Sequence, residues 1–152
     1  MGWFYGFKLH LIVNYQGEIV AAKVTTGNVH DTQPVTELAQ GLTDKLYGDK
    51  GYLSKALAAN LFEKGVTLVT TVRKNMKAKA MSLWDRAMLS KRFIIETIND
   101  QLKNISYIEH SRHRSMNGFM LNLLAGLVAY CLKKDKPSLN LTDVERNSMF
   151  MP

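Results

Sequence analysis

The chain has 152 residues, of which 46% are hydrophobic and 22% are charged, and its formal net charge is +7. This composition suits one globular domain with a buried core, and the charge favours a polyanionic partner, most simply nucleic acid, although many basic proteins bind none. The single cysteine, Cys131, excludes an internal disulfide framework and a cysteine-rich zinc site, and it fits a reducing, cytoplasmic location. The longest apolar run, at 119–132, is too short to span a bilayer and is expected to form a buried helix. The N-terminus has no signal-peptide pattern.

The first part of the chain predicts a β-hairpin followed by a helix. Aromatic and apolar residues alternate with polar ones over residues 3–14, which indicates a strand, and a turn leads into a second strand at 18–26. Asp31 or Thr32 is then expected to cap a helix at 35–40.

The rest of the chain adds two strands and three helices. The predicted strands are 45–48 and 66–72. The predicted helices are 54–64, with Ser54 as its cap, 83–104 and 117–133. This order predicts an α/β fold, in which an antiparallel hairpin feeds βαβ units into a mixed sheet covered by helices. Residues 1–136 are expected to form one domain, and 137–152 are expected to form a loose polar tail.

Two acids stand out by their position. Asp49 follows the strand at 45–48, and ligands usually bind at the carboxyl ends of parallel strands. Glu96 lies on the same side of its predicted helix as Arg92 and Lys103, at about 100° of rotation per residue. The apolar residues of that helix lie roughly opposite and are expected to face a core: Ile94, Ile98, Leu102 and Ile105.

Each acid taken alone has a simpler interpretation. Asp49 could satisfy the amides of its own turn, and Glu96 could form a surface ion pair with Arg92, worth only a few tenths of a kcal/mol. Taken together, an acid after a parallel strand and an acid on a late helix are what a Mg²⁺ site between sheet and helix needs. Two such ions can activate the attacking oxygen and stabilise the leaving oxygen in phosphoryl transfer.

Several motifs, in this order, resemble bacterial insertion-sequence DDE transposases. The spacing R-x3-E-x6-K of Arg92, Glu96 and Lys103 is similar to the signature around the last acid of these enzymes. The other matching stretches are GFKLHLIVN at 6–14, TTGNVHDTQPVTEL at 25–38, LYGDKGY at 46–52, RKNMK at 73–77, RFIIETINDQLKNISYIEH at 92–110 and SRHRS at 111–115. The resemblance implies an RNase H-like fold and a D-D-E triad that binds two Mg²⁺ or Mn²⁺ ions. By position, Asp49 matches the second acid and Glu96 the third, so both are expected to be catalytic metal ligands.

The resemblance also exposes a departure. In the RNase H-like fold, the first Asp lies on a strand upstream of the hairpin, whereas this chain begins inside the hairpin. Asp31 and Asp44 do not match that position. We therefore expect the C-terminal portion of a catalytic domain that lacks its first strand and is inactive as a truncated chain. The resemblance implies that the missing strand lies between the strands at 3–14 and 45–48. We therefore expect the chain to be marginally stable or prone to aggregation, or its sheet to be split or closed directly between those two strands.

Two classes of function stay open. The first is a transposase portion that cleaves and joins DNA strands by metal-dependent phosphoryl transfer, and the second is a non-catalytic DNA-binding remnant. A ribonuclease of the same fold is a third and weaker possibility, because the arginine-rich C-terminal signature argues against it. The partners are expected to be transposon ends and target DNA, without a membrane, and a homo-oligomer of the parent protein is left open. The cations expected to contact DNA are Lys50, Arg73, Lys74, Lys77, Arg92, Lys103, Arg112 and Arg114.

Overall fold

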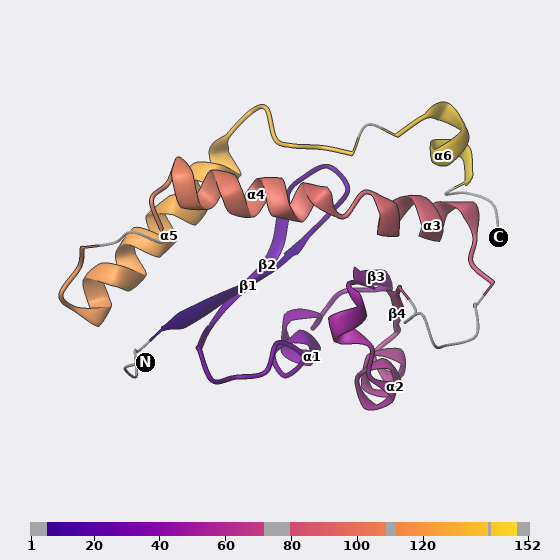
Figure 1. Cartoon of the computed structure of the whole chain (residues 1–152), viewed down its shortest axis with the longest axis horizontal. Coiled ribbons are helices and arrows are strands. Elements are labelled where there is room, and N and C mark those ends of the chain that lie inside the picture. The colour runs from indigo at the N-terminus through magenta and orange to yellow at the C-terminus, as the bar shows by residue number, and fades with distance from the viewer. Residues whose placement is uncertain (1–5, 72–79, 109–111, 140, 149–152) are drawn as a thin grey trace. The chain divides into compact units, whose positions relative to one another are not determined.

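The computed structural model of the chain describes residues 6–71, 80–108, 112–139 and 141–148 (Figure 1). The chain divides into two compact units. Unit 1 comprises Met1–Ile12, Val20–Lys91 and Leu141–Pro152, and unit 2 comprises Val13–Ile19 and Arg92–Asn140. The described residues combine strands and helices, so the predicted mixed α/β class is confirmed.

The predicted N-terminal hairpin is present as β1 (Phe7–Val13) and β2 (Ile19–Thr26). The Gly27 N–H donates to the Gly6 carbonyl oxygen at 2.7 Å, so the residue before β1 lies opposite the residue after β2, as in an antiparallel pair. The turn between the strands contains Gly17 at a φ of 80°. A residue with a side chain rarely adopts that backbone conformation.

A βαβ unit follows in unit 1. Its elements are α1 (Val35–Leu38), β3 (Asp44–Gly48), the 3₁₀ turn η1 (Lys50–Tyr52), α2 (Lys55–Glu63) and β4 (Val66–Thr70). Strands β3 and β4 pair in parallel, as a strand–helix–strand crossover requires. The predicted cap is confirmed, because the Ser54 hydroxyl accepts the Leu57 N–H at 3.3 Å.

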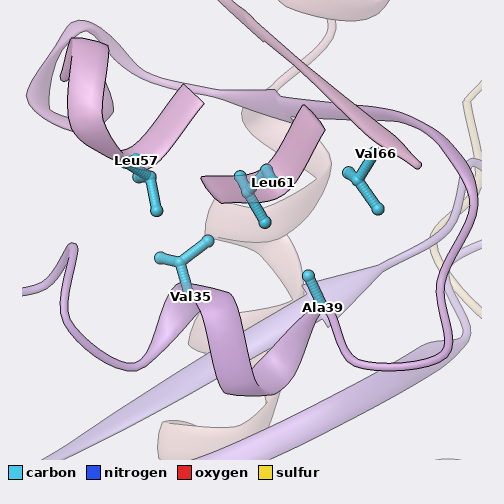
Figure 2. Close-up of a cluster of buried hydrophobic side chains, with 5 residues drawn as sticks. All are labelled: Val35, Ala39, Leu57, Leu61 and Val66. Carbon is cyan, nitrogen blue, oxygen red and sulfur yellow. The ribbon is translucent and has the colours of Figure 1, made fainter. Parts of the chain in front are cut away.

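One apolar cluster holds this βαβ unit together. Its buried members come from α1, α2 and β4, and they are Val35, Ala39, Leu57, Leu61 and Val66. Figure 2 shows Val35 of α1, and Ala39 directly after this helix, pointing toward Leu57 and Leu61 of α2. Leu46 of β3 packs against the same cluster, so the helices cover one face of the parallel pair.

The described strands form two separate two-stranded sheets, β1–β2 and β3–β4. The single mixed sheet expected from the element order is therefore wrong for the described residues, and the split form of the prediction is confirmed. Each of β1 and β3 hydrogen-bonds to one strand among these residues, which leaves each with an open edge.

The helix predicted over 83–104 is wrong in its continuity, because it is two helices, α3 (Leu83–Ser90) and α4 (Phe93–Asn104). The Ser90 hydroxyl donates to the Ala87 carbonyl oxygen at 2.8 Å, and such side-chain bonds to the preceding turn slightly destabilise and often bend helices. The interruption places Arg92 at the N-cap of α4 rather than inside a helix.

In unit 2, α4 packs against α5 (Met116–Leu132). The predicted core face of α4 is confirmed for Ile94, Ile98 and Leu102, all of which are buried. Ile105 is 67% exposed, because it lies beyond the last turn as the C-cap residue. That part of the prediction is wrong.

Helix α5 was expected to be buried, and this holds for one of its faces. Leu123, Gly126 and Tyr130 are buried, whereas several of its apolar residues are exposed, including Leu121, Leu124, Val128 and Leu132. The Tyr130 hydroxyl donates to the Gly17 carbonyl oxygen at 2.7 Å, which ties the helix to the hairpin turn. No helix in the described part of the chain is long and apolar enough to cross a membrane.

Two described parts of the predicted polar tail make defined contacts. Leu139 is buried, and its N–H donates to the Tyr15 carbonyl oxygen at 3.0 Å. Helix α6 (Asp143–Ser148) packs against α3, where the Lys91 ammonium lies 2.7 Å from the Glu145 carboxylate. The hydrogen bond from Lys91, with a second from the Thr142 N–H, lowers the pKa of Glu145 to about 2.

Candidate functional site

Asp49 lies at the carboxyl end of the parallel strand β3, in unit 1. Its side chain is exposed, and its Oδ1 accepts the Lys50 N–H at 2.6 Å, which makes Asp49 the N-cap of η1. The turn returns directly over the strand end, because a Cβ on Gly48 would lie 3.3 Å from the Tyr52 ring. The carboxylate thus has a defined place at the strand edge and one oxygen bonded to its own turn.

Tyr52 has two acids near it, Asp31 and Asp49. Burial raises the pKa of the Tyr52 hydroxyl first, and the negative charges of Asp31 and Asp49 raise it further. Asp31 does not cap α1, as the sequence led us to expect, because the N-cap residue is Pro34 and no side chain caps it. The Asp31 carboxylate instead pairs with the Lys8 ammonium of β1 at 3.0 Å.

Glu96 lies in the first turn of α4, in unit 2, and its side chain is exposed. An acid in the first turn is stabilised by the positive end of the helix dipole, and Lys103 lies in the last turn, where a cation is favoured. Ile94 and Ile98 of the same helix are buried, whereas Glu96 and Lys103 are exposed, so the predicted separation of apolar and charged faces is confirmed for these residues. Because Asp49 and Glu96 belong to different units, their approach to one another stays a prediction.

The family model described as "Transposase DDE domain" matches residues 1–116. The chain belongs to this family. The match includes both predicted acids and ends at the start of α5. No curated protein and no solved structure matches the chain.

Membership of the DDE transposase family implies a role in transposition, binding to DNA and use of divalent metal ions. Family membership therefore supports the prediction from the sequence that a divalent metal ion is used. Hard carboxylate oxygens, which both Asp49 and Glu96 supply, are the donors that Mg²⁺ and Mn²⁺ prefer. Among the residues that the structure describes, no group of three or more His, Cys, Asp or Glu side chains could hold a metal ion.

The cations predicted to contact DNA in this transposase domain fall into two sets. Those in the described part of the chain are all exposed: Lys50, Arg92, Lys103, Arg112 and Arg114. Arg73, Lys74 and Lys77 lie outside the described residues. Exposure is necessary for a phosphate contact, but the contacts themselves stay a prediction.

One polar cluster was missed by the sequence reasoning. Asp85 of α3 is buried, and its carboxylate accepts hydrogen bonds from the Lys45 ammonium and the Tyr47 hydroxyl of β3. Burial alone would raise the pKa of Asp85, but these hydrogen bonds outweigh burial and hold the pKa below its usual value. The available signal was the alternation of Lys45 and Tyr47 along β3, continued by Asp49 directly after the strand, which puts three polar groups on one face.

Proposed function

We propose that this transposase domain carries the metal-dependent phosphoryl-transfer chemistry that cleaves DNA strands at the ends of an insertion sequence and joins them to a target. The observation that carries the proposal is the exposed Asp49 carboxylate at the carboxyl end of a parallel strand, in a chain that belongs to the DDE transposase family. Glu96, exposed in the first turn of α4, is the second proposed acid.

In this proposal, Asp49 and Glu96 hold Mg²⁺ or Mn²⁺ with their carboxylate oxygens. When bound, such ions activate the attacking oxygen and stabilise the leaving oxygen. Lys50 follows Asp49 directly, and Arg92 precedes Glu96 by one helical turn, so each acid has a cation near it in sequence. These cations are proposed to hold the phosphates on either side of the scissile bond.

We expect the chain to bind DNA without sequence preference. The proposed surface consists of the exposed cations Lys50, Arg92, Lys103, Arg112 and Arg114. The logarithm of the binding constant should fall with the logarithm of the salt concentration, by a slope of about −0.9 for each phosphate neutralised. Fluorescence anisotropy with two unrelated DNA duplexes of equal length measures the slope for each duplex, and the two slopes should agree. Arg114→Gln should make the slope less steep by about 0.9.

The matched control is Lys55→Gln, because Lys55 is an exposed cation on α2 outside the proposed surface. It should leave the slope unchanged. An affinity that does not depend on salt would contradict the proposal, and so would equal effects of the two substitutions.

We also propose that the 152-residue chain does not catalyse strand cleavage by itself. The split between β1–β2 and β3–β4 supports this, because the family resemblance puts the strand that carries the first acid between β1 and β3. A site formed by Asp49 and Glu96 alone has no third carboxylate to bridge the two metal ions. This arrangement equally favours the alternative function, a DNA-binding remnant without turnover.

A nicking and strand-transfer assay with Mg²⁺ or Mn²⁺ tests this proposal. We expect no metal-dependent product from the wild-type chain above the level of the Asp49→Ala variant. Turnover that disappears in Asp49→Ala would show that the acids of this chain suffice. That result would exclude the non-catalytic alternative.

The remaining proposals concern the extent and setting of the domain. We propose that the catalytic portion extends over residues 1–136 and that 137–152 are an addition to it, anchored through Glu145 of α6 to Lys91. A cytoplasmic location stays a prediction from the single cysteine. An oligomer of the parent protein is also only a prediction.

A further inference from the structure

The carboxylate of Asp85 joins the first turn of α3 to strand β3. Its Oδ1 accepts from the Tyr47 hydroxyl at 2.7 Å and from the Lys45 ammonium at 2.9 Å, and its Oδ2 accepts from the same ammonium at 3.1 Å. The Asp85 N–H in turn donates to the hydroxyl of the N-cap residue Ser82 at 3.1 Å. These contacts of Asp85 with Lys45 and Tyr47, here called the Asp85 junction, lie wholly within unit 1.

These contacts distinguish Asp85 from a metal ligand. Both carboxylate oxygens are bonded to donors of β3, and the side chain is only 12% exposed. A metal ion would have to displace the Lys45 ammonium and would leave the Tyr47 hydroxyl without its acceptor. Leaving a buried polar group without a partner is costly, so Asp85 serves the strand that it contacts.

The two donors share a face of β3 with Asp49. Side chains alternate along a strand, so Lys45 and Tyr47 point to one face and Leu46 points to the other, where it packs against the apolar cluster. The alternation continues through Asp49, because its backbone is extended, with φ of −71° and ψ of 166°. Asp49 is therefore the next residue on the face that α3 holds through Asp85.

Strand β3 depends on this contact more than a central strand would. Among the described strands it pairs with β4 alone, so backbone hydrogen bonds fix one of its edges. The two faces of β3 supply the other restraints. On one face Leu46 packs against the apolar cluster, and on the other face Lys45 and Tyr47 bond to Asp85. Loss of the junction would free the end of β3 to tilt and would move the turn at Asp49.

We propose that Asp85 is a positioning residue for Asp49, which acts by fixing Lys45 and Tyr47 against α3 so that the Asp49 carboxylate keeps its place at the strand end. The proposal rests on the proposed function of Asp49 as a metal ligand. It assigns a role to a buried acid whose two carboxylate oxygens are both bonded to side chains of β3.

The test uses the full chain and the amide of Lys50, whose N–H donates to the Asp49 carboxylate at 2.6 Å. Asp85→Asn keeps the shape of the side chain but removes its charge, and Tyr47→Phe removes one hydroxyl. In both variants the Lys50 amide signal should shift upfield in the proton NMR dimension, and its hydrogen exchange should accelerate by roughly tenfold. Glu37→Gln is the matched control, because it breaks the exposed ion pair of Glu37 with Lys23 elsewhere in unit 1.

A second measurement connects the junction to the metal. Mn²⁺ titrated into the protein should broaden the amide signals around Asp49 in the wild-type chain but not in Asp49→Ala. In Asp85→Asn the Mn²⁺ concentration that gives half of the broadening should rise by about tenfold, as for other residues that orient a metal ligand. Glu37→Gln should behave as the wild type does.

The two readouts separate the two proposals. A folded Asp85→Asn or Tyr47→Phe variant with an unchanged Lys50 amide would overturn the positioning role. Broadening that is absent in the wild type, or that persists in Asp49→Ala, would overturn the metal-ligand role of Asp49, while the Lys50 amide still decides whether Asp85 fixes the turn. If Asp85→Asn does not fold, Tyr47→Phe gives the decision.

Discussion

Alanine at position 17 should destabilise unit 2 by about 2–5 kcal/mol, the combined cost of backbone strain and overpacking. A Cβ on Gly17 would lie 1.9 Å from the Pro137 carbonyl oxygen, and the backbone φ of 80° is one that only glycine adopts readily. The oxygen belongs to the backbone, so it cannot turn away as a flexible side chain would. The loss should appear as a lower midpoint of urea unfolding, which the fluorescence of the chain monitors.

Gly41→Ala separates strain from collision. Gly41 has a φ of 79°, but nothing lies within 4 Å of the position of its Cβ. Its substitution should therefore cost only the backbone strain, about 1–2 kcal/mol. Equal losses in the two variants would show that the hairpin turn does not lie against the segment around Pro137.

Truncation of Leu61 to alanine should destabilise the βαβ unit by about 2–5 kcal/mol. Leu61 is fully buried in the cluster between α1, α2 and β4, so alanine leaves a cavity there (Figure 2). The same cluster supports Leu46 of β3 and therefore the strand that ends at Asp49. Thermal unfolding followed by circular dichroism measures the loss.

Phe62→Ala is the control beside it in the sequence. Phe62 lies on the same helix but is 72% exposed, so its truncation should change the stability by less than about 0.5 kcal/mol. A larger loss from Phe62→Ala than from Leu61→Ala would mean that α2 presents its other face to the core.

Much of the local structure could be predicted from the sequence because local chemistry determines it. Ser54 caps α2, Gly65 follows that helix at a φ of 79°, and alternating residues form the hairpin. The buried residues Ile94, Ile98 and Leu102 follow from helical periodicity. These features need only neighbours within a few residues along the chain.

The ion pairs of Asp31 and Asp85 were missed because their partners are distant in sequence. Asp31 has the spacing of a helix cap but pairs with Lys8, 23 residues away. Asp85 is 40 residues from Lys45. No local pattern contains these partners. The break of the helix over 83–104 is a different case, because its hydrophobic pattern is favourable throughout and the bond of the Ser90 hydroxyl to Ala87 spans only 3 residues.

The candidate site divides in the same way. The position of Asp49 after a parallel strand was predicted from the alternation of elements and is confirmed. The exposed face of Glu96 followed from helical periodicity. Whether the two acids share an ion depends on how unit 1 and unit 2 come together, which neither periodicity nor spacing determines.

Iron-directed cleavage of the chain tests the shared metal site most directly. Fe²⁺ replaces Mg²⁺ on carboxylate ligands, and with ascorbate and peroxide it generates radicals that cut the backbone near the ion. If Asp49 and Glu96 hold a common metal centre, the wild-type chain should be cut near both residues, and Asp49→Ala or Glu96→Ala alone should abolish both cuts, while Glu37→Ala leaves them. Cleavage near one acid that persists after the other is removed would contradict a common centre, and so would cleavage near neither.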